Sequence, residues 1–282
     1  MIPISLSIAA CLGWGVADFI GGFKSRRIPV MSILLVSSWT GAVMFGMLVI
    51  VTGARLPQNP GVFWAVPAGI CGILAMFFLY RGLARGTMSV IAPISATGVI
   101  IPVIFGLLCG EPLTLLSLAG IVIAVIGSTL AAIENHQEAD RQRLTRGVGL
   151  AVASAVFIGL YFIFMDSAAA HDPLWASLCM RLSNLAALAL VFLSGRSKGS
   201  VGWPPRSHLH WIILMGALDT LAAYAFVLAT SKGLLSEVAV ISSLYPAVTI
   251  TLSTVILRER ISHTQKSGII LALVGVVLIS AF

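Results

Sequence analysis

The sequence predicts an all-α integral membrane protein in which ten transmembrane helices form two inverted five-helix repeats around a central cavity. Hydrophobic residues make up 59% of the 282 residues and charged residues only 10%. A soluble globule of this size needs a more polar surface. The chain also contains apolar stretches of bilayer length, and its second half repeats the first in outline. We therefore expect a multi-pass protein of the cell membrane.

The predicted helices follow from the thickness of the bilayer. A hydrocarbon core of about 30 Å needs about 20 apolar residues per helix. Ten stretches meet this requirement: 2–23, 30–52, 61–80, 88–109, 113–133, 147–168, 173–194, 209–230, 234–257 and 263–281. Most connections between them are short, so consecutive helices should be antiparallel neighbours. No basic segment precedes the first apolar run, as it would in a cleavable signal peptide, so we expect the first span to be retained.

A charged run from Glu134 to Arg146 separates two apolar halves, 1–133 and 147–282. Sliding the second half back by 144 to 148 positions aligns landmarks in the same order: Pro29 with Pro173, Trp64 with Trp211, Gly69 with Gly216, Gly86 with Gly233, Glu111 with Glu259, Gly120 with Gly268, and Gly127 with Gly275. This order indicates an internal duplication. Because each half has five spans, its ends lie on opposite membrane faces, and the second copy should be inverted.

The basic residues predict the orientation. Fourteen of the 17 fall on one side of the predicted membrane: Lys24, Arg26, Arg27, Arg81, Arg85, Arg141, Arg143, Arg146, Arg196, Lys198, Arg206, Arg258, Arg260 and Lys266. Only Arg55 and Lys232 fall on the other side. Cytoplasmic loops carry the excess of Lys and Arg, so both termini are predicted on the outer side.

Three ionisable residues lie well inside predicted spans, namely Asp18, Arg181 and Asp219. Placing such a residue at the centre of a transmembrane helix costs about 2.5 to 3.5 kcal/mol of insertion free energy, so these residues usually form ion pairs or contact water. Arg181 could pair with either acid as a purely structural bridge. Two acids against one base leave one carboxylate free to titrate or to meet a cationic group, as a proton-coupled carrier of amines or amino acids requires. Asn184, one turn after Arg181, adds a polar group to the same face.

Aromatic residues supply candidates for the wall of a pocket. Trp14 and Tyr161 lie within spans, and Tyr245 directly precedes Pro246, so these three are expected to line a substrate site. Tyrosines near helix ends are often anchors at the membrane interface, which is the expectation for Tyr80.

Small and polar residues recur at helical spacing in several spans. Span nine presents Ser242, Pro246, Thr249 and Ser253 on one face, and span four contains Pro102. Small faces allow close helix packing, and they can also line a cavity. Pro102 and Pro246 free backbone carbonyls inside the membrane, so we expect breaks in these helices that serve gating. Ser242 joins the predicted substrate site.

The sequence lacks the residue patterns that are typical of several classes of function. The four cysteines contain no CxxC pair, and the histidines show no metal-binding spacing. The basic residues lie in short loops without interleaved aromatic residues, which argues against nucleic-acid binding. No nucleophile–base pair or nucleotide-binding loop is found. The prediction is therefore a non-enzyme without metal or cofactor, whose partners are a small-molecule substrate and the lipid bilayer. A monomer is expected because both repeats needed for a closed bundle are already in one chain.

The ends of the fourth and ninth spans carry a specific motif. Gly110 to Thr114 (GEPLT) is followed by Gly120 and Gly127, and Arg258 to Ser262 (RERIS) is followed by Gly268 and Gly275. With the Gly13-Trp14-Gly15 opening, these motifs resemble the drug/metabolite transporter superfamily, in its ten-helix EamA type. The resemblance covers nearly the whole chain. It implies two inverted five-helix repeats around a central cavity and transport of amino acids or other metabolites by alternating access. Arg258 stands where the family usually has Gly, and Asp18 and Asp219 are outside the shared pattern.

The expected function is a secondary active transporter that exports small metabolites such as amino acids or amines, coupled to protons. No GxxxxGK[ST] loop is present, so a gradient or an exchange must supply the energy. A gradient-independent facilitator or exchanger and an importer are the alternatives. A channel or a lipid-handling membrane protein is less favoured.

Overall fold

The computed structural model describes residues 2–85, 88–112, 114–131, 141–193, 204–257 and 262–280, and all regular structure in these ranges is helical. The helices of the first half are α1 (Ile2–Ser25), α2 (Val30–Thr52), η1 (Pro60–Trp64), α3 (Ala65–Leu83), α4 (Met88–Ala96), η2 (Thr97–Val99), α5 (Ile100–Leu108) and α6 (Leu115–Ala131). Those of the second half are α7 (Arg141–Ala169), α8 (Pro173–Leu193), α9 (Arg206–Thr230), α10 (Leu235–Ser242), α11 (Tyr245–Ile256) and α12 (His263–Ser280).

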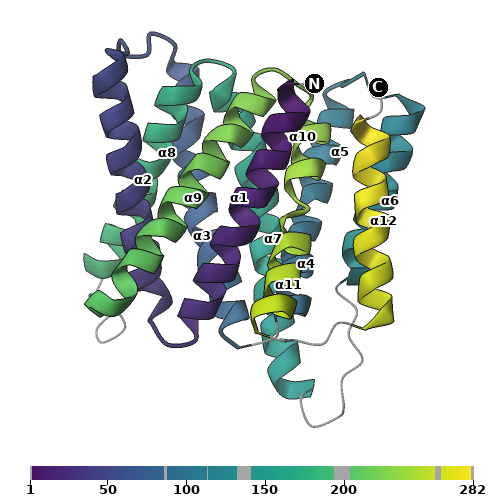
Figure 1. The fold of residues 1–282 in the computed structure, drawn as a ribbon. Coiled ribbons are helices and arrows are strands. Elements are labelled where there is room, and N and C mark those ends of the chain that lie inside the picture. Colours follow the sequence, from purple (N-terminus) through teal and green to yellow (C-terminus); the bar gives the residue numbers. More distant parts are fainter. Residues whose placement is uncertain are drawn as a thin grey trace.

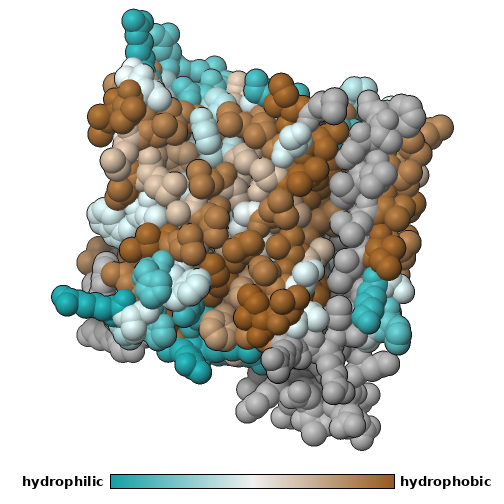
Figure 2. All heavy atoms as spheres, viewed as in Figure 1, coloured by the Kyte–Doolittle hydropathy of each residue, from teal (hydrophilic) through white to brown (hydrophobic). Residues whose placement is uncertain are grey.

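The helices stand side by side as a bundle of membrane height (Figure 1). Seven described helical segments are long and apolar enough to cross a bilayer, and Ile94–Leu108 and Leu118–Gly127 are shorter apolar segments. Apolar side chains such as Ile50, Leu108 and Leu193 are largely exposed on the outside of the bundle. Figure 2 shows this apolar surface across the middle of one face, with hydrophilic residues gathered toward its upper and lower margins. The chain is an all-α membrane protein.

The two chain ends lie at the same end of the bundle. We call this end, where α1 begins and α12 ends, the terminal end, and the other the opposite end (Figure 1). The predicted linker is only partly described. Its first part, 134–140, lies outside the described residues, whereas 141–146 form the first turns of α7, which thus begins before the span predicted from 147. Charged residues are compatible with a helix that continues beyond the apolar core of a membrane.

Helices of the two halves interleave throughout the bundle. Helix α1 packs along α9, and α3 packs along α7. Helix α2 contacts α9 and α8, while α8 also contacts α3. Helices α6 and α12, the last of each half, form a pair at the side of the bundle (Figure 1). The interior is therefore made jointly by both halves of the sequence.

Glycines permit the closest helix crossings. A Cβ at Gly98 would collide with the backbone carbonyl of Ala155 on α7, and one at Gly159 would lie 2.6 Å from the carbonyl oxygen of Gly98. Gly15 of α1 similarly meets Val248 and the Tyr245 carbonyl of α11. These small residues bring backbones together, which is how helices associate in lipid. Part of the small-residue pattern is thus accounted for by packing.

Two helical stretches are interrupted near the middle of the bundle. The fourth is α-helical to Ala96, turns through η2, and continues as α5, in which Pro102 is the third residue. The ninth stops at Ser242 and resumes at Tyr245, so that Pro246 lies in the first turn of α11. In a first turn the missing proline N–H leaves no intrahelical hydrogen bond unmade. Both prolines follow a break closely.

Candidate functional site

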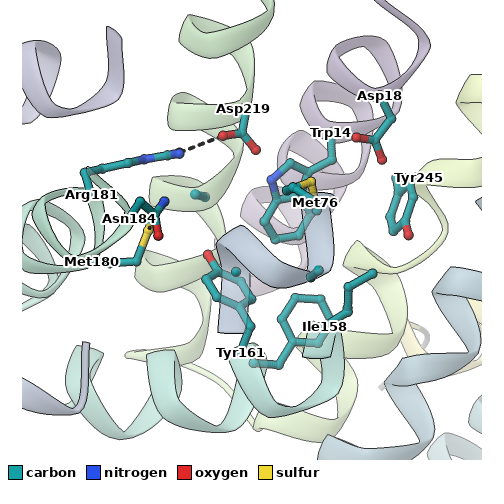
Figure 3. Close-up of a pocket in the computed structure, with 14 residues that line it drawn as sticks. Trp14, Asp18, Met76, Ile158, Tyr161, Met180, Arg181, Asn184, Asp219 and Tyr245 are labelled. Atoms are coloured by element: carbon teal, nitrogen blue, oxygen red, sulfur yellow. Dashed lines mark hydrogen bonds and ion pairs between the residues drawn. The ribbon is translucent and has the colours of Figure 1, made fainter. Parts of the chain in front are cut away.

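A small cavity lies inside the bundle between two apolar layers. The layer nearer the terminal end includes Trp14, Phe162 and Phe226, and the layer nearer the opposite end includes Ile33 and Leu79. The cavity between them has a volume of about 60 Å³ and is lined by residues from α1, α3, α7, α8, α9 and α11. Seven of the eight residues predicted for the substrate site line it: Trp14, Asp18, Tyr161, Arg181, Asn184, Asp219 and Tyr245 (Figure 3).

Arg181 and Asp219 form a buried ion pair between α8 and α9. The Nη2 atom of Arg181 lies 2.8 Å from Oδ2 of Asp219. Arg181 is 4% exposed, and its Nε has no hydrogen-bond partner among the described residues. Gly41 of α2 and the Thr220 hydroxyl flank the guanidinium, and a Cβ at Gly41 would lie 2.7 Å from Nε. The missing side chain at position 41 therefore makes room for the arginine.

Asp18 is the second carboxylate at the cavity, and its partner is a tyrosine. The Tyr80 hydroxyl donates a hydrogen bond to Oδ1 of Asp18 over 3.2 Å. Asp18 is 4% exposed, and within the described residues no cationic group lies within ion-pair distance of it. Of the two acids that could pair with Arg181, the structure brings Asp219 to it. The cavity thus contains two carboxyl groups and one guanidinium.

The role expected for Tyr80 is wrong. Tyr80 is 1% exposed and points into the bundle, away from the membrane interface. Its ring lies over Gly21 of α1, where a Cβ would be 2.7 Å from the ring. Position near a helix end suggested an anchor, but the glycine at the α1–α3 crossing provides a buried place for the ring. The sequence contains a signal for this, since Asp18 and Gly21 are nearly one turn apart on α1.

Aromatic rings close the cavity on the side of the terminal end. The Phe162 and Phe226 rings stack with centroids 4.6 Å apart, and Trp14 lies 5.9 Å from Phe162 and 5.6 Å from Phe226. Tyr161 joins this group 5.7 Å from Phe162. Phe162 and Phe226 were not predicted for the site. Phe226 lies seven residues after Asp219, hence on the same face of α9, which is the pattern that could have identified it.

Two further polar side chains line the cavity. The amide nitrogen of Asn184, in the orientation that satisfies it, donates to the carbonyl oxygens of Gly69 over 2.6 Å and Met180 over 3.2 Å. This ties α8 to α3 beside Arg181. The Tyr245 hydroxyl is buried and has no hydrogen-bond partner in the described part of the chain. Tyr245 is one of the residues that line the cavity (Figure 3).

Ser242 is the one predicted substrate-site residue that does not line the cavity. It is fully buried, and its hydroxyl donates to the carbonyl oxygen of Ser7 on α1 over 3.5 Å. Ser242 ends α10, one turn nearer the terminal end than Tyr245. The face of the ninth span turns at the break between them, so helical spacing could not keep the two residues together. Within the described residues no three His, Cys, Asp or Glu side chains gather as a metal site would require.

Comparisons with known proteins identify the fold and the family of this chain. A solved crystal structure of another protein superposes with a TM-score of 0.75 at 18% identity, over 98% of this chain and 95% of that one, so the two share a fold. An uncharacterized protein of Methanocaldococcus jannaschii is 25% identical over 131 residues, which cover 46% of this chain and 93% of the relative. The sequence profile of the EamA-like transporter family matches residues 1–133 and 145–281, nearly the whole chain. The protein is thus a membrane protein that belongs to the EamA-like transporter family, within the drug/metabolite transporter superfamily.

Proposed function

We propose that the chain is a secondary transporter that exports small amine-bearing metabolites, amino acids among them, by alternating access and in exchange for protons. The observation that carries this proposal is the charge of the cavity. Asp18 and Asp219 face it with a single base, Arg181, and only Asp219 is paired. The surplus carboxyl group suits an ammonium group or a proton, because a buried charge needs a partner.

The wall of the cavity fits the organic part of such a substrate. Trp14, Tyr161 and Phe162 line it, and aromatic rings attract ammonium groups and pack against apolar side chains. Arg181 can bind a carboxylate if the Asp219 carboxylate turns away from it. An amino acid could therefore place its ammonium group near Asp18 and its carboxylate near Arg181.

The size of the cavity supports a transport cycle with a closed stage. Sites for small organic ligands usually enclose about 300 to 1,000 Å³, whereas this cavity measures about 60 Å³. Clusters of apolar side chains lie on both sides of it along the bundle. Binding and release of a substrate therefore require one layer to part while the other stays closed, which is the alternating-access principle.

An inverted repeat would provide the two related halves that this cycle needs. In such a repeat α1, α2 and α3 correspond to α7, α8 and α9. The contacts between helices agree with this correspondence: α1 packs on α9 as α7 packs on α3, and α2 packs on α9 as α8 packs on α3. The family profile matches in two parts, and the archaeal relative spans about one half of this chain. We infer ten transmembrane helices, with α4–α5 and α10–α11 each counted as one broken helix, in a domain arrangement of 1–133 and 147–282.

The basic residues support a cell-membrane orientation with both termini outside. Lys24, Arg81 and Arg206 lie at the opposite end of the bundle, and Arg55 and Lys232 lie at the terminal end. With the opposite end cytoplasmic, the arrangement follows the positive-inside rule.

Uptake into proteoliposomes tests the proposed function. A mixed pool of labelled amino acids and amines is offered with and without an imposed pH gradient. We expect saturable uptake that grows with the gradient, and we expect Asp18→Asn to abolish the response to the gradient. Asp172→Asn is the matched control, since Asp172 caps α8 through the N–H groups of Leu174 and Trp175, and asparagine caps helices equally well.

The same assay separates the alternatives. Uptake that does not depend on the pH gradient, and that is faster when the proteoliposomes are preloaded with substrate, would identify an exchanger or facilitator. In that case Asp18 would not be a proton acceptor. Uptake that does not saturate would identify a channel and overturn the proposal.

A further inference from the structure

A basic side chain joins α1 to α9 at the opposite end of the bundle. The Lys24 ammonium nitrogen lies 3.4 Å from Nδ1 of His208, in the first turn of α9. A lysine ammonium has donors and no acceptor, so Nδ1 of His208 accepts and the ring proton is on Nε2. Within the described residues the His208 ring makes no other hydrogen bond. The remaining N–H groups of Lys24 and the Nε2–H group of His208 can therefore donate to an acceptor from outside the protein.

Aromatic rings position this ammonium group. Its nitrogen lies 5.4 Å from the centroid of the Trp211 ring and 5.6 Å from that of the Phe23 ring. Cation–π contacts at these distances are attractive and limit the directions in which the lysine can point. Trp211 is 42% exposed and Phe23 is 36% exposed. These two rings, with Lys24 and His208, form a cationic surface site with aromatic walls, which we call the lysine cluster.

The lysine cluster lies at an end of the molecule where the described residues supply no carboxylate. The described Asp and Glu side chains line the cavity or lie toward the terminal end: Asp18, Glu111, Asp166, Asp172, Asp219 and Glu237. Two exposed arginines flank the cluster. Arg27 donates its backbone N–H to the Lys24 carbonyl oxygen over 3.0 Å, and Arg206 begins α9. The charge of the site is therefore complementary to an anion.

The surface that continues from the lysine cluster is apolar. Leu214 and Leu221 follow Trp211 on one face of α9 with exposures of 45% and 57%, and Leu12 of α1 is 52% exposed. Helices α1 and α9 pack together at the front of Figure 1, and Figure 2 shows the same face apolar across its middle and hydrophilic along its lower margin. Tryptophan is typical of the boundary between acyl chains and head groups. The cluster therefore lies at the depth of the lipid head groups.

We propose that the lysine cluster binds the phosphate group of an anionic phospholipid of the membrane. The phosphate oxygens accept from Nζ of Lys24 and Nε2 of His208, the glycerol backbone contacts the Trp211 ring, and the acyl chains follow the exposed leucines of α9. A phosphodiester fits because it offers several oxygen acceptors and a negative charge. In a zwitterionic lipid, the neighbouring guanidinium groups would repel the cationic part of the head group.

This inference goes beyond the proposed transport and does not depend on it. Lys24 and His208 belong to α1 and α9, the helices that carry Asp18 and Asp219 to the cavity. A lipid held by both side chains therefore bridges two helices of the cavity wall at their ends in the membrane interface.

Lipid binding to the purified protein tests the site. The protein is delipidated in a neutral detergent, and native mass spectrometry measures the dissociation constants of phosphatidylglycerol and of phosphatidylcholine with the same acyl chains. We expect the parent to bind phosphatidylglycerol more tightly than phosphatidylcholine. Lys24→Gln should weaken the binding of phosphatidylglycerol about fivefold, since one basic residue near the membrane surface contributes about 1 kcal/mol to the attraction of anionic lipid. Its binding of phosphatidylcholine should stay unchanged.

Three further variants separate charge from position. Lys24→Arg keeps the charge and should retain most of the affinity for phosphatidylglycerol. Lys266→Gln is the matched control: it removes an exposed lysine at the same end, in the first turn of α12 at the side of the bundle, and should leave the affinity unchanged (Figure 1). Trp211→Leu removes the ring against the ammonium and should weaken the binding of phosphatidylglycerol, so it serves if Lys24→Gln does not yield folded protein.

The outcomes that would overturn the inference are specific. Equal losses in Lys24→Gln and Lys266→Gln would show attraction by net charge without a site. Unchanged binding of phosphatidylglycerol in both Lys24→Gln and Trp211→Leu would show that the lipid binds elsewhere. Soluble glycerol phosphate, which has a phosphate and no acyl chains, should not displace the lipid. Displacement by an equal concentration of glycerol phosphate would identify a free phosphate compound as the ligand and reject the lipid.

Discussion

Arg181, Asp219 and Asp18 are the charged side chains on which the site depends, and their environments differ. Arg181 and Asp219 neutralise each other, whereas Asp18 relies on the Tyr80 hydroxyl. A buried ion pair contributes little net stability, but removing one partner leaves an uncompensated charge and is strongly destabilising. The Arg181–Asp219 pair therefore holds α8 and α9 together in a way that a ligand competing for either charged group can rearrange.

A double-mutant cycle tests this description of the ion pair. Asp219→Leu alone leaves Arg181 unpaired and should destabilise the protein by about 3 to 5 kcal/mol. Adding Arg181→Met should restore much of that stability, and transport should stay lost in both variants. Thermal unfolding in detergent and uptake are the measurements. Full stability of Asp219→Leu alone would show that Arg181 has another acceptor.

Gly41 positions Arg181 without touching a substrate. A Cβ there would lie 2.7 Å from both Arg181 Nε and Thr220 Oγ1. We expect Gly41→Ala to displace the guanidinium and to raise KM about tenfold for a substrate with a carboxylate, with a smaller effect on an amine without one, since about 1.4 kcal/mol of binding is lost. Gly46→Ala is the matched control on the same helix, because nothing lies within 4 Å of a Cβ at that position. Equal kinetics of the two variants would contradict the proposed role.

At the scale of the helices, the bundle is held together by close backbone contacts. Gly98 and Gly159 let η2 and α7 meet at the break in the fourth stretch. Interrupted helices expose backbone groups, which are tolerated in a membrane only where protein or a water-filled cavity surrounds them. The break and the crossing therefore belong together, and a larger residue at the crossing should disturb both.

Substitution at this crossing should destabilise the bundle. Gly98→Ala would force the added methyl group into the Ala155 carbonyl, and overpacking of this kind costs about 1 to 3 kcal/mol. Gly149→Ala, on α7 with nothing within 4 Å of its Cβ, should be neutral. The comparison is made by thermal unfolding of the purified variants. A neutral Gly98→Ala would mean that η2 and α7 can separate without cost.

At the scale of the whole molecule, one cavity lies between two apolar clusters, and its mainly apolar wall includes Asp18, Arg181 and Asp219. The interleaved packing of the halves, with α1 on α9 and α3 on α7, lets each half contribute to both layers. In the alternating access proposed above, movement of one half against the other would open one end and keep the other closed.

The orientation of the molecule can be tested directly. Reporter fusions after α12 should be active only when the reporter works outside the cytoplasm, and a fusion in the loop between α1 and α2, beside Arg26 and Arg27, should show the reverse. The physical reason is the excess of Lys and Arg at the opposite end of the bundle. A cytoplasmic C-terminal reporter would invert the assignment of sides.

The sequence by itself determined the helices and the charged candidates. Bilayer-length apolar runs are local patterns, and their positions agree with the described helices to within a few residues at most ends. The start of α7 is the larger difference. Asp18, Arg181 and Asp219 were identifiable because an ionisable residue inside an apolar span is costly wherever its partner lies.

Only the tertiary structure decided which of these residues meet. Partner choice depends on distances between helices far apart in sequence, so spacing could not say that Arg181 pairs with Asp219 and that Asp18 turns to Tyr80. Tyr80 was assigned to the interface because its burial depends on Gly21 of another helix. Helical spacing placed Ser242 on one face with Pro246, but in the structure its hydroxyl donates to the carbonyl oxygen of Ser7 on α1.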